Sequence, residues 1–405
     1  MANRAVRDYS TPIFVAGMLI TGCSNSLLTK FQDNQCVEFC DGPLEERRYF
    51  EQPVVQTFQM FIAEAACWGL VFFDSMMSTY HSGPSPSQTD VEEVGGAIDD
   101  LQITSDANMT LLSTTTSGIK PDSPALDGRR VFNLSLPAFC DICGTTLMNV
   151  GLFFTPVSIY QMTRGSLVLF VGLFSVVFLN RRLEARQWGA LFMVVLGVFV
   201  VGLSGVLYAD ESSNSAVERS LSQVAFGIIL IALAQLFTAT QFVYEEHILT
   251  AYHLDSMRVV GYEGVFGLAL TGLIMITAYI TVGHSASSHG GYFDTPTAVK
   301  EIFTHTGVLV TSVFIMLSIG AFNFFGISVT RKISATSRST IDTCRTLCIW
   351  LLSITFGWEE FNFLQLLGFS LLVYGTLVFN HIISPYILDR FDPEREGQVR
   401  LEDED

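Results

Sequence analysis

Three charged residues interrupt an otherwise apolar stretch, residues 333–356, at a spacing that places them on one side of a helix. Arg338, Asp342 and Arg345 follow at intervals of four and three residues, so we expect both arginines to share Asp342. A guanidinium presents a planar fork of donors that suits phosphate or carboxylate. Either one arginine is left free to meet an anion, or the three residues form a static ladder of ion pairs that fixes the helix.

The length of this stretch suits a helix that crosses a bilayer, but its charges oppose insertion. Its apolar side chains contribute roughly 4 kcal/mol to insertion, whereas three charges near the middle of a membrane cost about 8 kcal/mol on the same scale. The polar face must therefore meet a protein interior or a water-filled cavity. We interpret it as the lining of a solute pathway.

A second candidate binding face lies near residue 164. Arg164 shares one helical face with Tyr160 and Gln161, and an arginine at membrane depth either has a structural partner or contacts a solute. Asp141 either pairs with one of the arginines or acts as a proton-coupling carboxylate. The side chains of Asn149 and Asn323 either form hydrogen bonds between helices or contact the solute.

Two further acids stand alone in apolar segments. Glu64 and Glu263 are candidates for proton coupling, with a hydrogen-bonded contact between helices as the alternative. The seven histidines show no metal-ligand spacing, and the chain lacks the common hydrolase, metalloprotease and phosphate-loop motifs. We therefore expect no enzyme, no metal and no cofactor.

Composition places the chain among membrane proteins. Its 405 residues are 49% hydrophobic and 15% charged, which is typical of a polytopic protein embedded in a lipid bilayer. The net charge of −17 excludes a nucleic-acid partner, because no basic surface is available to neutralise phosphates.

The pattern predicts an all-α fold with ten spans and one long interruption. A disordered loop is expected at 77–130 and an acidic cytosolic tail at 385–405. The predicted spans are 12–29, 53–75, 133–153, 156–179, 187–208, 221–244, 258–282, 306–329, 333–356 and 361–384.

Basic residues predict the orientation of these spans. With both termini in the cytosol, the cytosolic segments hold most of the 22 Lys and Arg residues, as the positive-inside rule requires. Cys36 and Cys40 lie in a loop on the opposite side and form the only plausible disulfide.

An internal repeat divides the chain into a half at 1–208 and a half at 221–384. Gly151-Leu-Phe-Phe-Thr155 matches Gly326-Ile-Ser-Val-Thr330, and Arg164 has its counterpart in Arg338. Five spans separate the copies, so the second half is inverted in the membrane. Inverted repeats are typical of secondary transporters that bind their substrate between the halves.

Several long runs resemble the drug/metabolite transporter superfamily, and most closely the F-type branch of solute carrier family 35, which is similar to nucleotide-sugar transporters. The resemblance is carried by CDICGTTLMNVGLFFTPVSIYQMTRGSLVLFVGLFSVVFLNRRLEARQW (140–188), YEGVFG (262–267), FNFFGISVTRKISATSRSTIDTCRT (322–346) and GWEEFNFLQLLGF (357–369). It implies two inverted five-helix halves, cytosolic termini and alternating access around a cavity lined chiefly by helices 3, 4, 8 and 9. It implies no particular substrate.

We therefore predict a transporter of a small polar solute, anionic or zwitterionic, in an endomembrane (Golgi, lysosome or vacuole, or endoplasmic reticulum). The alternatives are an exporter of cationic drugs, peptides or amino acids, and a membrane scaffold that acts through its loop or tail. A homodimer is left open. The predicted substrate-binding residues are Arg164, Gln161, Tyr160, Asp141, Asn149, Asn323, Arg338, Asp342 and Arg345.

Overall fold

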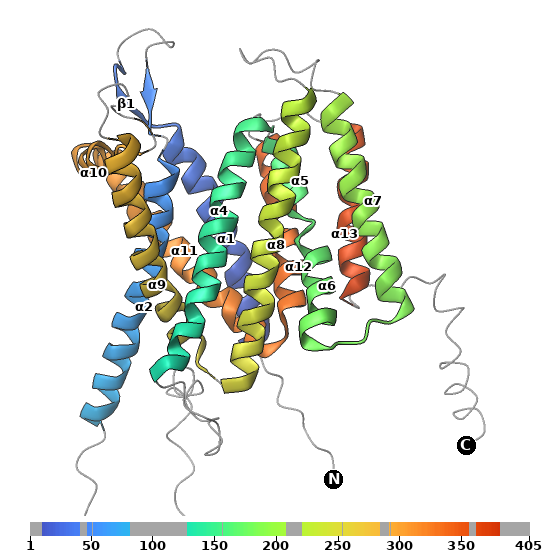
Figure 1. The fold of residues 1–405 in the computed structure, drawn as a ribbon, viewed down its shortest axis with the longest axis horizontal. Helices are drawn as coiled ribbons and strands as arrows, with labels where there is room; N and C mark the ends of the chain where they lie inside the picture. The colour runs from blue at the N-terminus through green and yellow to red at the C-terminus, as the bar shows by residue number, and fades with distance from the viewer. Residues whose placement is uncertain are drawn as a thin grey trace, which may run out of the picture.

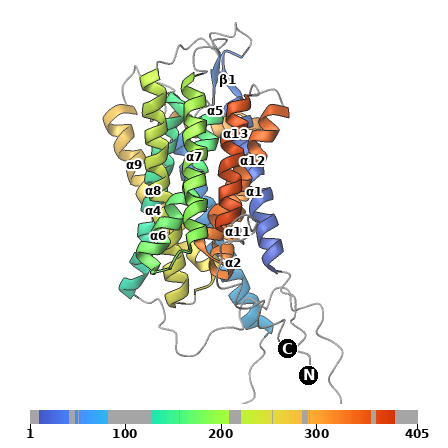
Figure 2. The same cartoon turned by 90° about the vertical axis from the view of Figure 1, so that its right-hand side faces the viewer.

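The protein is a bundle of long apolar helices with a small hairpin at one end (Figures 1 and 2). The computed structural model describes residues 10–40, 47–50, 52–81, 128–155, 157–207, 221–252, 254–283, 291, 293–355 and 362–380. The helices of the first half are α1 (Ser10–Asp33), α2 (Pro53–His81), α4 (Ser135–Phe154), α5 (Val157–Arg164), α6 (Leu167–Leu179) and α7 (Ala185–Leu207). Those of the second half are α8 (Leu221–Tyr252), α9 (Ser256–Ala278), α10 (Thr295–Thr304), α11 (Thr306–Lys332), α12 (Ala335–Thr355) and α13 (Phe363–Phe379).

Short elements complete the chain. The 3₁₀ helix η1 (Gly128–Leu134) leads into α4, and the π-helical turn η2 (Tyr279–Gly283) ends α9. Strands β1 (Cys36–Glu38) and β2 (Arg48–Tyr49) form an antiparallel hairpin between α1 and α2. We call the end of the bundle with this hairpin the hairpin end. The opposite end, where α1 begins and α13 ends, is the terminal end (Figure 1).

Within the described residues, eight helical segments are long and apolar enough to cross a membrane, and one of them, Met162–Leu179, runs across the junction of α5 and α6. They carry large apolar side chains on their outer faces; Phe72, Phe192 and Phe199 are each at least 65% exposed. In water such a surface would be unfavourable, whereas lipid tails accommodate it. The chain is therefore an integral membrane protein.

Each of the ten predicted spans overlaps a described helix, and two of these helices are not in the class just described. The span 333–356 forms α12, which is not among the eight because it carries three charges, and 361–384 forms α13, an apolar helix of 17 residues. The ten-span arrangement as two inverted halves stays a prediction.

Four details differ from the sequence-based expectation. The span 156–179 is not one helix, since α5 and α6 are separated at Gly165 and Ser166. Helix α10 and the hairpin stand where only loops were expected. The expected loop at 77–130 is shorter at both ends, because α2 extends to His81 and η1 starts at Gly128. Residues 82–127 and 381–405 lie outside the described residues.

Helices of one half pack mainly on helices of the other. The four densest pairings are α7 with α13, α4 with α8, α1 with α11, and α2 with α9. Glycines allow the closest of these approaches: a Cβ placed on Gly197 of α7 would lie 2.7 Å from the backbone oxygen of Gly368 on α13. The two halves therefore form one interleaved bundle.

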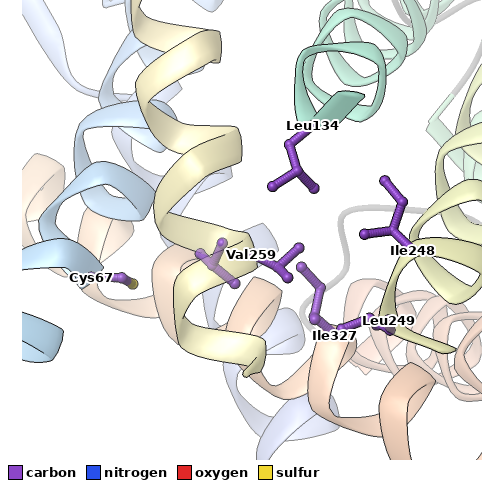
Figure 3. Close-up of a cluster of buried hydrophobic side chains, with 7 residues drawn as sticks. Cys67, Leu134, Ile248, Leu249, Val259 and Ile327 are labelled. Carbon is purple, nitrogen blue, oxygen red and sulfur yellow. The ribbon is translucent and has the colours of Figure 1, made fainter. Parts of the chain in front are cut away.

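A cluster of buried apolar side chains lies toward the terminal end, near the start of α4 and the end of α8. Figure 3 shows its side chains. It joins five elements, with Cys67 from α2, Leu134 from η1, Ile248 and Leu249 from α8, Val259 from α9 and Ile327 from α11. We call this group, together with Val260, the terminal plug. Leu134 and Val259 are fully buried, so the plug is closely packed.

Candidate functional site

A cavity of about 710 Å³ lies within the bundle and reaches toward the hairpin end. Its mouth is lined by Lys30 and Asp33 at the end of α1 and by Gln52 and Pro53 at the start of α2, the residues that flank the hairpin. Its floor is formed by residues of α4, α8, α11 and α12. Seven of the predicted substrate-binding residues line it: Asp141, Asn149, Tyr160, Arg164, Asn323, Arg338 and Asp342.

Arg164 is the last residue of the short helix α5, directly before the break in the helix. Its guanidinium lies 5.7 Å from the ring centre of Tyr160, one turn earlier. No carboxylate lies within ion-pair distance of it among the residues that the structure describes. Gln161 is also part of α5, but its side chain lies outside the described residues.

The break that positions Arg164 is held by the backbone. The amides of Gly165 and Ser166 donate to carbonyls three residues earlier, Met162 and Thr163, at 3.0 Å each, so the chain tightens before α6 begins. Gly165 allows Leu372 of α13 to pack closely there, since a Cβ would lie 2.8 Å from a methyl group of that leucine, which would have to move. Discontinuous helices at membrane depth commonly form binding sites in transporters.

The arginines of α12 do not share Asp342 as expected. Arg345 binds Asp342 at 2.7 Å and donates to the hydroxyl of Ser26 on α1 at 3.2 Å. Arg338 instead forms an ion pair with Glu245 of α8, and both side chains are almost fully buried. The two arginines therefore have different carboxylate partners, and Arg345 does not line the cavity.

Arg338 lines the cavity but is almost fully buried by its neighbours. Its guanidinium carbon lies 3.8 Å above the ring centre of Phe242, a cation–π distance, and its Nε atom has no hydrogen-bond acceptor among the described residues. Gly326 of α11 leaves the room that it needs, because a Cβ there would lie 2.8 Å from Nε.

The acids predicted for pairing or proton coupling gather near Arg338. Asp141 lines the cavity and accepts a hydrogen bond from Thr145, one turn along α4, at 3.2 Å. Glu64 accepts a hydrogen bond from Asn323 of α11, and both it and Glu263 are buried away from the cavity wall. The charges of Glu64, Asp141 and Glu263 all interact with Arg338 and Glu245.

Sequence reasoning missed Glu245 and its neighbour Glu246. The predicted span ended at residue 244, which placed both outside the membrane, whereas α8 continues to Tyr252. The apolar residues Ile248 and Leu249 continue the helical pattern beyond the two acids and were the available signal.

Glu245 and Glu246 lie next to the end of the cavity that is farther from the hairpin, because Glu245 binds the lining residue Arg338. Glu246 binds Arg181, which follows α6, and accepts a hydrogen bond at 2.8 Å from the backbone N–H of Ala335, the first residue of α12. With the Arg338–Glu245 pair, α8 is thus tied to α6 and α12 just below the cavity floor. The terminal plug lies beyond these bonds. No group of three metal-ligating side chains occurs within the described part of the chain.

A disulfide lies in the hairpin next to the mouth of the cavity. Cys36 and Cys40 form the predicted disulfide, with their Cα atoms 5.8 Å apart. Arg48 of β2 binds Glu38 of β1 and Glu301 of α10, so it ties the hairpin to the second half. Partial burial lowers the pKa of Arg48, but the bonds to the two carboxylates outweigh it and raise the pKa overall.

Comparisons with known proteins agree on one family. Residues 125–335 match the model of the family described as nucleotide-sugar transporter. The chain is 34% identical over 396 residues to "Solute carrier family 35 member F6" of Homo sapiens, covering 96% of this chain and 95% of that one. It is 35% identical over 367 residues to an uncharacterized protein of Schizosaccharomyces pombe, covering 91% and 96%. A UDP-galactose transporter of the same yeast is 29% identical over 90 residues, 22% of this chain and 26% of that one.

Proposed function

Because this chain belongs to solute carrier family 35, within the nucleotide-sugar transporter family, and is a membrane transporter rather than an enzyme, we propose that it carries a small polar solute with an anionic group. The observation that carries the proposal is Arg164. It is a cavity-lining guanidinium that has no carboxylate partner among the described side chains, placed at a break in a helix. Such a group favours a phosphate or carboxylate of the solute.

The proposed mechanism is alternating access. The cavity extends to the hairpin end, whereas ion pairs of Glu245 and Glu246 and the terminal plug lie between it and the terminal end. Movement of solute to the other side requires that these contacts separate while contacts at the mouth form. A bound solute drives this step only by the difference in its affinity for the two states.

We propose that the hairpin end faces the lumen of an endomembrane compartment and that both termini face the cytosol. The Cys36–Cys40 disulfide supports this orientation, because disulfides persist in oxidising compartments and are rare in the cytosol. The distribution of Lys and Arg along the chain points the same way.

Three features support an inverted repeat of five spans. In both predicted copies a threonine hydroxyl donates to the glycine carbonyl four residues earlier, Thr155 to Gly151 at 3.0 Å and Thr330 to Gly326 at 3.1 Å. The matched arginines Arg164 and Arg338 line one cavity. The helix pairs also follow this symmetry. Exchanging the halves converts the pair of the first and eighth spans (α1 with α11) into the pair of the sixth and third spans (α8 with α4), and both pairs are in contact.

The test is counterflow in proteoliposomes with radiolabelled anions, including UDP-galactose, organic phosphates and amino acids. Arg164→Gln should reduce flux of the transported solute at least tenfold, because the neutral amide lacks the charge that attracts the anion. Arg331→Gln is the matched control, since Arg331 forms an exposed ion pair with Asp255 outside the cavity. Flux by Arg164→Gln equal to that of the wild type would contradict the proposal.

A further inference from the structure

Charge is distributed unequally around the cavity, and one side of it has an excess of guanidinium groups. This side centres on Asp342, which binds Arg345 at 2.7 Å. The charge of Arg164 also interacts with Asp342, from the α5 side of the cavity. Among the described side chains this side thus holds two guanidiniums and one carboxylate, and only Arg345 is bound to that carboxylate. We call this the arginine side.

The other side has an excess of carboxylates. It centres on Arg338, whose ion-pair partner is Glu245. Asp141, Glu64 and Glu263 lie close enough that their charges interact with the same arginine. Helices α2 and α9 bring two of them together, since a Cβ on Gly264, next to Glu263, would lie 2.7 Å from the Cβ of Glu64. We call this the acidic side.

Only one residue of each side is left to meet a solute. Glu245 holds Arg338, and Asn323 donates to Glu64. Asp141 lines the cavity and accepts a hydrogen bond from Thr145 of its own helix, and no cation lies within ion-pair distance of it in the described ranges. Arg164 is its counterpart on the arginine side. Of the described charges on these two sides, Asp141 and Arg164 are therefore the anion and the cation that remain for a solute.

Helix α12 sets the separation between the two sides. Arg338 and Asp342 are four residues apart on one face, which is about 6 Å along the helix axis. Asp141 interacts with the first of them and Arg164 with the second. Asp141 and Arg164 both line the cavity, but these two described side chains are not within ion-pair distance of each other, so their charges are not neutralised in an ion pair.

We propose that the cavity binds a dipolar solute, with its anionic group at Arg164 and its cationic group at Asp141. This rests on the proposed transport function and names the class of solute. A zwitterion satisfies both sides at once. A solute with only phosphates or carboxylates leaves Asp141 unpaired and brings like charge toward the acidic side, and a purely cationic solute leaves Arg164 unpaired.

The first experiment uses wild-type protein and needs no variant. Thermal unfolding of the purified full chain in detergent is measured with matched triplets, each a zwitterion with its amine and acid analogues. The probes are phenylalanine with phenethylamine and 3-phenylpropanoate, and phosphoethanolamine with ethanolamine and ethyl phosphate; UDP-galactose is the purely anionic reference. A bound ligand raises the unfolding temperature. In at least one triplet the zwitterion should reach its half-maximal shift at a concentration at least tenfold lower than either analogue.

Two variants then assign the groups. Asp141→Asn should remove the advantage of the zwitterion over its acid analogue, and Arg164→Gln the advantage over its amine analogue. The controls Asp255→Asn and Arg331→Gln, from the exposed ion pair, should change neither ranking.

The outcomes separate the two proposals. If acid analogues or UDP-galactose stabilise the wild type as well as zwitterions do, and Arg164→Gln abolishes this, the dipolar solute is wrong and anion transport stands. If amines alone stabilise the protein, or no probe does, both proposals fail.

Discussion

At the scale of the residue, the buried arginines show what a single sequence can and cannot predict. The charged residues on one face of α12 correctly indicated a polar cavity, because the free energy of placing a guanidinium in lipid is too high. The partner of Arg338 was predicted wrongly. Spacing along one helix predicts a partner such as Asp342, which lies three residues before Arg345. It cannot predict Glu245, which lies 93 residues before Arg338 on another helix.

We expect substitutions of Arg338 and Glu245 to have strongly non-additive effects on the free energy of unfolding. Glu245→Gln or Arg338→Met alone should lower the free energy of unfolding in detergent by about 3 kcal/mol or more, because each leaves one member of a buried ion pair without its direct partner. The double variant should cost less than the sum of the two. The exposed pair of Arg331 and Asp255, about a third exposed at each side chain, is the control cycle. Its coupling should stay below about 1 kcal/mol. If the changes in unfolding free energy at Arg338 and Glu245 were additive, the two residues would not form a buried ion pair.

At the scale of the element, hydropathy located the spans but not their interruptions. The break between α5 and α6 lies at Gly165 and Ser166, directly after Thr163 and Arg164, and a Gly-Ser pair in a helical pattern is too weak a signal to predict a break by itself. It depends on the close approach of Leu372 to Gly165, a contact between distant segments. Helix α10 was missed for a related reason: it is a short helix of ten residues between two spans, where a loop was expected.

Glycines of α7 offer a matched test of helix packing. Gly197→Ala should destabilise the protein by roughly 1–3 kcal/mol, because the new methyl group would overlap the backbone of Gly368 and Leu372. Gly189→Ala on the same helix has open space around it and should be neutral or stabilising by up to about 1 kcal/mol, the gain in helix propensity. Thermal unfolding in detergent measures both. Equal effects of the two changes would contradict the close α7–α13 contact.

At the scale of the whole molecule, the cavity has a defined direction. It is lined from the hairpin end down to the first turn of α12, and beyond that point the bonds of Glu245 and Glu246 and the terminal plug intervene. The sequence indicated that a cavity exists but not which end is open, because that depends on how five elements meet at Leu134 and its neighbours.

Thiol labelling tests this direction. In a background without the free cysteines, Gln56→Cys lines the cavity and should react rapidly with a membrane-impermeant reagent added on the hairpin side. Val260→Cys, in the terminal plug, should react at least tenfold more slowly from either side. The parent without the free cysteines is the control for background labelling. Rapid reaction of Val260→Cys from the terminal side would show that this end is open.

The interleaved packing of the halves also has a consequence for how the protein is made. Four helices of the first half each pack most extensively on a helix of the second half: α1 on α11, α2 on α9, α4 on α8 and α7 on α13. When the ribosome has synthesised only the first half, these partners are still absent. The first half should therefore be degraded when expressed alone and rescued when the second half is co-expressed as a separate chain. Assembly in the membrane follows the completion of the chain, and a nascent first half depends until then on lipid or on helper proteins to shield its small-residue faces.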